Sequence, residues 1–150
     1  MRTRTLALPL TLAREGPPAV RLPVLPVVPR LGNVTAHPVR ALVDTGAHAV
    51  LATMKLARRL GLDPARLRES PHRPVWQDPD GLPLASYGAF VHLTLGDPHA
   101  GDVIALGETL VYFTDAPFGP YPLRLGQVGF LDRVTFTQYG DAQFALDRAD

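Results

Sequence analysis

The stretch ALVDTGA, from Ala41 to Ala47, decides the fold that we expect for this chain. The Leu-Val pair before the acid is apolar and suits a buried strand. After the acid, Gly46 permits a tight turn, and the hydroxyl of Thr45 is able to bond back to the main chain. Asp44 is therefore predicted at the tip of a buried strand, where a rigid element holds its carboxylate.

Length and composition around this stretch favour one mainly β domain. The chain has 150 residues, of which 46% are hydrophobic, enough to bury a core, so we expect residues 1–150 to form a single domain. Its 16 prolines and 13 glycines are spread along the sequence without a repeat. That spread indicates many turns and edge strands rather than long helices.

Charge and residue types exclude several classes of function. The formal net charge is +1 and the basic residues are scattered, so nucleic acid is not an expected partner. The sequence contains no cysteine, and its five histidines form neither a helical HExxH motif nor a close pair with carboxylates at familiar metal spacing. There is no Gly-rich phosphate loop. We therefore expect neither a metal site nor a cofactor.

The N-terminal stretch MRTRTLALPLTLAREG has two interpretations, a signal peptide or a strand. Leucines at every second position from Leu6 to Leu12 favour the strand, and the apolar run is short for a signal peptide. No stretch has the length of a membrane span. The sequence thus predicts no membrane association and a cytoplasmic protein.

The first half of the chain predicts strands followed by one principal helix. Residues 19–28 are extended, and prolines at 23 and 26 favour an edge strand. Residues 34–43 lead into Asp44. Thr53 is a good N-cap for a helix that ends at Gly61, and Asp63-Pro64 is able to start a second, shorter helical turn.

The second half predicts two hairpins. Residues 74–95 form extended arms around the turn dipeptide Asp80-Gly81, and the final hairpin turns at residues 139–141. Between the hairpins we expect separate strands over 103–106 and 109–114. The segment LRLGQVGFLDR, residues 123–133, then predicts an apolar strand that runs into a short helix.

In both motifs and order, residues 20–147 resemble the retropepsin-like aspartic proteases, in particular bacterial members. ALVDTGA is similar to the catalytic loop of that family, residues 75–90 occupy the place of its flap, and LRLGQVGFLDRVTF resembles the segment in which an apolar pair and a glycine support the loop. The resemblance implies a mainly β, closed-barrel-like acid protease single-lobe domain with one principal helix and a flap hairpin.

The activity that this resemblance implies needs two carboxylates, which share one proton and act as base and acid. The chain has one DTG triplet, so a second Asp44 has to come from an identical subunit across a two-fold axis. The implied function is that of a homodimeric aspartic endopeptidase acting on peptides or proteins. Asp44, Thr45 and Gly46 are its catalytic residues, and the Thr45 hydroxyls brace the two loops across the axis.

The resemblance also assigns residues to substrate binding. In the catalytic loop these are Ala47, where bilobal relatives usually have a hydroxyl residue, and His48. The hairpin turn contributes Asp80, Gly81 and Leu82, and the supporting segment contributes Gly126. Trp76 of the hairpin has a simpler interpretation, which is that it packs the hairpin onto the barrel.

Three positions depart from the family pattern. Retroviral members carry an acid and an arginine where this chain has His48 and Gln127, so we expect a polar bond in place of their ion pair. Arg124 interrupts the apolar pair before Gly126 and is predicted to face solvent. Gly129 weakens the predicted short helix.

Several alternatives stay open at the level of sequence. An Asp-Thr-Gly triplet is often an ordinary turn, and an inactive dimer would serve as a peptide-binding or protein-binding module. A heterodimer with another DTG-bearing chain is a third possibility. The loop GDPHAGD, residues 96–102, fits a solvated turn better than a cation site, and Ser70 and Ser86 lack the context of a catalytic serine.

Overall fold

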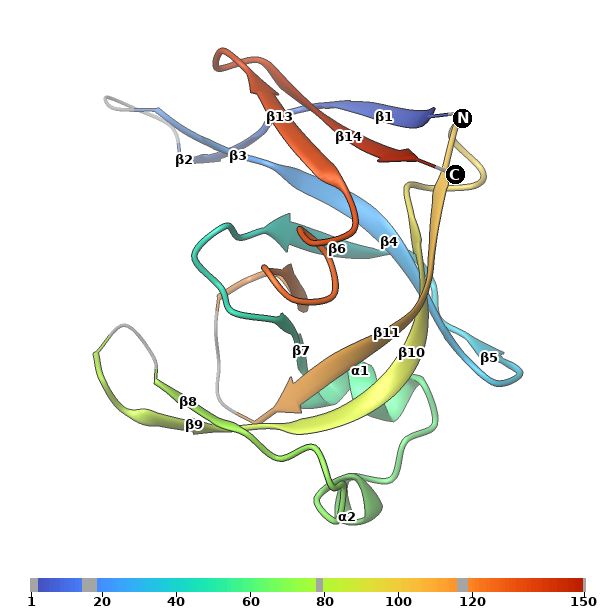
Figure 1. Ribbon diagram of the computed structural model, residues 1–150, viewed down its shortest axis with the longest axis vertical. Helices are drawn as coiled ribbons and strands as arrows, with labels where there is room; N and C mark the ends of the chain where they lie inside the picture. The colour runs from blue at the N-terminus through green and yellow to red at the C-terminus, as the bar shows by residue number, and fades with distance from the viewer. Residues whose placement is uncertain (1–2, 15–18, 78–79, 116–118, 150) are drawn as a thin grey trace.

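Six strands close into a barrel in the computed structural model, which describes residues 3–14, 19–77, 80–115 and 119–149 (Figure 1). Strands account for 54% of the structure and helices for 7%, so the mainly β prediction is confirmed. Around the barrel the order is β10, β11, β7, β12, β6 and β4, and a pairing between β10 and β4 completes the ring. The barrel strands are β4 (Val24–Leu31), β6 (Val39–Val43), β7 (Val50–Thr53), β10 (Tyr87–Leu95), β11 (Ile104–Thr114) and β12 (Leu123–Leu125).

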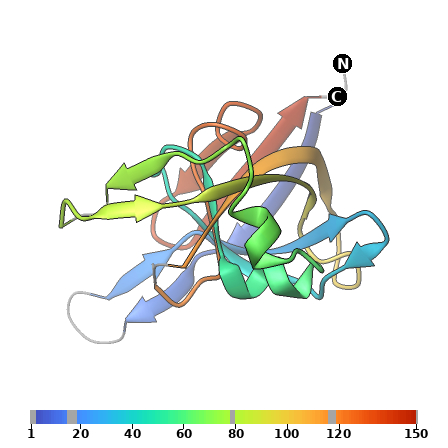
Figure 2. The ribbon, with the colours of Figure 1, turned by 90° about the horizontal axis from the view of Figure 1, so that it is seen from below.

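The remaining strands extend from the barrel. A three-stranded sheet has the order β1-β14-β13, in which Thr3 pairs with Ala149, so the first and last described residues lie side by side (Figures 1 and 2). Two further strand pairs are the hairpins β2–β3 and β8–β9, and β5 pairs with β4. These strands are β1 (Thr3–Pro9), β2 (Thr11–Arg14), β3 (Val20–Leu22), β5 (Val34–Thr35), β8 (Val75–Gln77), β9 (Pro83–Ala85), β13 (Thr135–Tyr139) and β14 (Gln143–Ala149).

Alternate residues of each barrel strand point inward, and the barrel interior is apolar because these residues are mostly hydrophobic. On β12, for example, Leu123 and Leu125 are fully buried while Arg124 between them is half-buried. β6 shows the same alternation. The largest fully buried side chains are Phe113, Phe130, Phe144, Leu25, Leu56, Leu60, Leu93, Leu95, Ile104, Leu106, Leu123 and Leu125.

Two short helices follow β7 and lie together on one side of the barrel (Figure 2). The principal helix α1 (Met54–Arg59) starts as predicted, with the Leu56 N–H donating to the Thr53 hydroxyl over 3.3 Å. The second, shorter helical turn predicted at Asp63-Pro64 is present as α2 (Pro64–Leu67), and Asp63 caps it. Neither helix, within the residues described, is long and apolar enough to cross a membrane.

Residues 19–28 divide into β3 and the start of β4, and the predicted edge position is wrong for β4, because β4 pairs with β6 on one side and with β10 on the other. Proline lacks a donor, but its carbonyl still accepts. The carbonyl of Pro23 receives the Val43 N–H over 2.9 Å, and that of Pro26 receives the Gly96 N–H over 2.8 Å. A closed barrel therefore accommodates these prolines without giving them an edge.

Two other predicted boundaries differ. The separate strands over 103–106 and 109–114 are one strand, β11, with Gly107 at φ +82° and a register shift opposite Leu93. A glycine bulge thus bends the strand without ending it. The N-terminal strand, by contrast, divides at Leu10, although the Leu10 N–H still bonds the Ala142 carbonyl over 2.8 Å in the register of the β1–β14 pair.

The predicted short helix after Gly126 is absent, and residues 127–133 form turns instead. Gly129 has φ +96°, which an α-helix does not contain, and its N–H bonds the Asp132 carboxylate over 3.0 Å. The final hairpin is confirmed, since β13 and β14 pair on either side of residues 140–142.

Candidate active site

Asp44 follows β6 directly and is fixed at both ends of its backbone. Its N–H donates to the Leu125 carbonyl over 2.9 Å, and its own carbonyl accepts the Ala47 N–H over 3.1 Å. The Gly46 N–H bonds the carboxylate oxygen Oδ1 over 3.0 Å. The Asp44 loop, residues 44–49, is therefore a hydrogen-bonded turn that holds one carboxylate, 27% exposed, at the barrel rim.

The tip of the Asp44 loop is open to solvent. Thr45 and Gly46 are both exposed, and a Cβ added at Gly46 would meet only Asp44 Oδ1, at 3.5 Å. Ala47 is half-buried and His48 is exposed. The side of the loop that carries Thr45 is thus accessible to another chain.

Residues 126–128 brace the loop from behind. The Gln127 N–H donates to the Ala47 carbonyl over 2.9 Å, and its Nε2 donates to the Thr45 carbonyl over 2.6 Å. The Val128 N–H donates to the His48 carbonyl over 3.0 Å. Gln127 therefore supplies the expected polar bond, but to the Thr45 backbone rather than to the His48 side chain.

Gly126 lies where no side chain fits. A Cβ there would stand 2.3 Å from the Ala49 carbonyl oxygen and 2.5 Å from that of Ala47. Because the backbone of the Asp44 loop fills this space, Gly126 is placed to support the loop from behind. This position matches the supporting glycine of the sequence resemblance better than a substrate contact.

Arg124 does not face solvent as predicted. Its side chain is only 28% exposed, and Nη1 lies 3.4 Å from Asp44 Oδ2, within ion-pair distance. Alternation on β12 does place Arg124 on the outer face of the barrel, but β6 and β7 lie on either side of β12, so side chains of both strands border Arg124 on that face. Since Asp44 alternates with the buried Val43, it emerges on that same face. Alternation in the sequence therefore indicates that Arg124 and Asp44 lie on the same face of the sheet, which is the one sequence feature that points to their contact.

The hairpin β8–β9 reaches the loop through aromatic contacts. The His48 and Trp76 rings stack with centroids 5.7 Å apart and an interplanar angle of 14°. Trp76 also meets Tyr112 of β11 edge to face at 5.7 Å. Its Nε1 donates to the Ser86 hydroxyl over 2.9 Å, which in turn donates to the Pro74 carbonyl over 3.0 Å. Trp76 thus packs the hairpin onto the barrel, and it touches the Asp44 loop as well.

The turn of this hairpin is exposed. Asp80, Gly81 and Leu82 all face solvent, with Leu82 62% exposed. Gly81 has φ +79°, the conformation that its turn dipeptide favours. Residues 78 and 79 lie outside the described residues.

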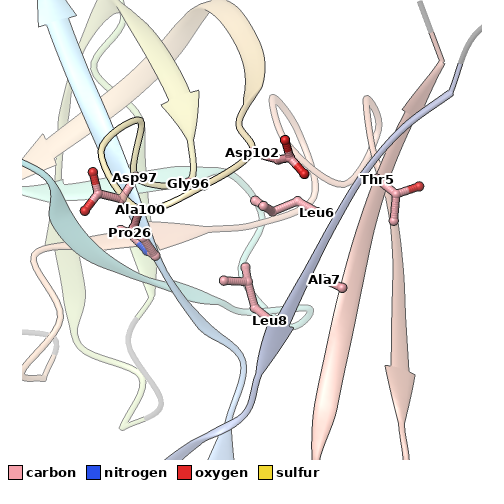
Figure 3. Close-up of a pocket in the computed structure, with 10 residues that line it drawn as sticks. Thr5, Leu6, Ala7, Leu8, Pro26, Gly96, Asp97, Ala100 and Asp102 are labelled. Carbon is pink, nitrogen blue, oxygen red and sulfur yellow. The ribbon is translucent and has the colours of Figure 1, made fainter.

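A separate pocket lies between β1 and residues 96–102, lined by Leu6, Leu8, Pro26 and the two acids Asp97 and Asp102 (Figure 3). The carboxylates of these acids lie apart and point in different directions in Figure 3. Asp97 Oδ1 accepts the His99 N–H over 2.9 Å, as in a solvated Asx turn. Among residues 3–14, 19–77, 80–115 and 119–149, no three His, Asp or Glu side chains gather to hold a metal.

A closed six-strand barrel with one DTG loop at a strand tip defines the class of single-lobe, retropepsin-like aspartic proteases. The model of the aspartyl protease family matches residues 30–107, and the chain belongs to this family. No curated protein matches the sequence. Among solved structures, a retropepsin-like aspartic protease from Rickettsia conorii is similar, with a TM-score of 0.57, 17% identity, and coverage of 94% of this chain and 98% of that one.

Proposed function

We propose that the chain is a homodimeric aspartic endopeptidase that hydrolyses peptide bonds with a water activated by Asp44 of both subunits. The observation that supports this most is a half-buried carboxylate, fixed by backbone bonds at the end of a barrel strand, beside an exposed loop tip. An aspartate in an ordinary turn would not need the hydrogen bonds by which residues 126–128 support this loop. A carboxylate that has to lie opposite its own copy needs such support, because its position must be fixed.

The chemistry requires the second copy. The ionised Asp44 carboxylate accepts a proton from water, while the protonated Asp44 carboxyl group of the other subunit donates its proton to the carbonyl oxygen of the peptide. Two carboxyl groups about 3 Å apart cannot both ionise freely, so they hold one proton between them. Two-fold symmetry supplies this pair from a single Asp44, with Thr45 and Gly46 completing each loop.

In this proposal the β8–β9 hairpin acts as the flap. It already contacts the Asp44 loop through the stacked His48 and Trp76 rings. Closure over a bound peptide would exclude water and bring its turn, Asp80, Gly81 and Leu82, to the substrate. Ala47 and His48 would line the floor beside the scissile bond, on a loop that Gly126 supports.

A second candidate is a peptide-binding module with the same fold and no turnover. The contact between Arg124 and Asp44 favours it. A guanidinium 3.4 Å from Asp44 already pairs with the carboxylate that the Asp44 of a second subunit would have to approach. The two candidates differ in hydrolysis, which is directly measurable.

The test is digestion of a peptide library by the wild type and by Asp44→Asn, analysed by mass spectrometry. The asparagine carbonyl is still able to accept the Gly46 N–H, so the loop should keep its fold. We expect cleavage by the wild type that a pepstatin-like inhibitor blocks, and a loss of at least about a thousandfold in Asp44→Asn. Equal turnover by both would reject the protease, whereas binding without turnover by either would favour the module.

A further inference from the structure

Arg124 is a charged side chain held inside the candidate site. Its Nη1 lies 3.4 Å from Asp44 Oδ2, and a Cβ added at Gly119 would stand 3.4 Å from its Nη2. The guanidinium therefore lies between the Asp44 carboxylate and the backbone of residue 119. Two-thirds or more of each partner's side chain is covered, with exposures of 28% and 27%.

Strand register places aliphatic side chains on both sides of Arg124. It pairs with Leu42 of β6 and with Leu51 of β7, and paired residues point to the same face of a sheet. Both leucines are half-buried. The result is a patch of two leucines and one guanidinium, from three adjacent barrel strands, next to Asp44.

We propose that Arg124 is a specificity-determining residue, which selects peptides with an acidic side chain directly beside the scissile bond. The inference rests on the proposed protease function and deepens it. A substrate whose bond lies over Asp44 places the flanking side chain on the patch. The leucines contact its methylene groups, and the guanidinium pairs with its carboxylate.

The charge and shape of the guanidinium favour this substrate class. Arginine offers a planar fork of donors that matches a carboxylate, and in the free protein its carboxylate partner is Asp44. A Glu or Asp of the peptide competes for the same donors. An uncharged side chain of equal size leaves them with Asp44, and a lysine adds like-charge repulsion. In a two-fold dimer the second Arg124 does the same on the other side of the bond.

The experiment compares paired peptides that differ only by Glu or Gln beside the scissile bond, at a pH above 6, where glutamate, with a pKa of about 4.3, is ionised. For the wild type we expect kcat/KM to favour Glu at least about tenfold. Arg124→Leu matches the neighbouring leucines and should bring the Glu to Gln ratio to about one. Arg124→Lys keeps the charge and should retain part of the preference.

Arg40→Met is the matched control. Arg40 lies on the same face of β6, over the Tyr121 ring at 5.4 Å, and four residues before Asp44, which is roughly 13 Å along a strand. The substitution Arg40→Met removes one positive charge from the same face of the barrel, as Arg124→Leu does, but at a position away from the candidate site. Its Glu to Gln ratio should equal that of the wild type.

The outcomes separate the inference from the function on which it rests. Cleavage by the wild type with a Glu to Gln ratio near one, or an unchanged ratio in Arg124→Leu, would overturn the role of Arg124 and leave the protease intact. An equal fall of the ratio in Arg40→Met would also overturn it, because the preference would then reflect general charge. Absence of any Asp44-dependent cleavage would instead reject the protease.

Discussion

At the scale of single residues, the candidate site depends on close backbone packing behind one carboxylate. Gly126 leaves room for the Ala47 and Ala49 carbonyls, and Gln127 bonds the loop from the same side. The side-chain amide of Gln127 donates a hydrogen bond to the Thr45 carbonyl, which supports the loop without burying a charge. The position of the Asp44 loop thus depends on these few contacts.

Gly126→Ala tests this packing. An added Cβ at 2.3 Å from one carbonyl oxygen and 2.5 Å from another forces backbone to move, so we expect a loss of roughly 3 kcal/mol in the free energy of unfolding. Urea denaturation measures it. Gly101→Ala is the control, since a Cβ there meets nothing within 4 Å, and equal stabilities of the two variants would contradict the packing argument.

At the scale of elements, the β8–β9 hairpin is tied to the barrel by a short chain of contacts. Ser86, fully buried, links the Trp76 indole to the Pro74 carbonyl and so joins β8 to the residue before β10. Trp76 in turn contacts β11 through Tyr112. Few other buried side chains belong to the hairpin, which makes this link decisive for its position.

Ser86→Ala should loosen the hairpin. The Trp76 Nε1–H would lose its partner, at a cost of roughly 1–3 kcal/mol, whereas the Pro74 carbonyl would keep the backbone N–H of residue 86. We expect faster hydrogen exchange in β8 and β9 with unchanged protection in β10 and β11, and a higher KM for peptide.

Ser70→Ala is the control for this change. The Ser70 hydroxyl also makes two hydrogen bonds, to the Gly88 carbonyl and from the His72 N–H, but it lies outside the hairpin. Its loss should leave exchange in β8 and β9 unchanged. Equal effects of the two variants on the hairpin would refute the role of Ser86.

At the scale of the whole molecule, one chain folds into one barrel with one Asp44 loop, whose tip at Thr45 is exposed. The proposed reaction needs two such loops. Activity should therefore depend on protein concentration around the dissociation constant of the dimer. It should also depend on the composition of each dimer.

Subunit mixing tests the shared site. When wild type and Asp44→Asn are combined in equal amounts and allowed to exchange, random pairing leaves about one quarter of all dimers with two aspartates, against about one half without exchange. We expect the activity per wild-type chain to fall by about half. Activity unaffected by excess Asp44→Asn, with exchange verified by mass spectrometry, would argue against a site built from two subunits.

The sequence by itself determined the local features of this protein. Apolar residues before Asp44, the glycine turn after it, the Thr53 cap and the hairpin dipeptides each act within a few residues, so the mainly β fold and the Asp44 loop were predictable. The prolines of β4 and the bulge at Gly107 misled the strand boundaries, because a carbonyl still accepts and a bulge bends a strand without ending it.

Only the tertiary structure decided which distant side chains meet. Arg124 is separated from Asp44 by 80 positions, and Trp76 from His48 by 28, and each contact depends on the order of strands around the barrel. Alternation showed that Arg124 points out of the core, but not that β6 and β7 lie on either side of it. Strand order arises from pairing across the whole chain, which no short stretch of sequence encodes.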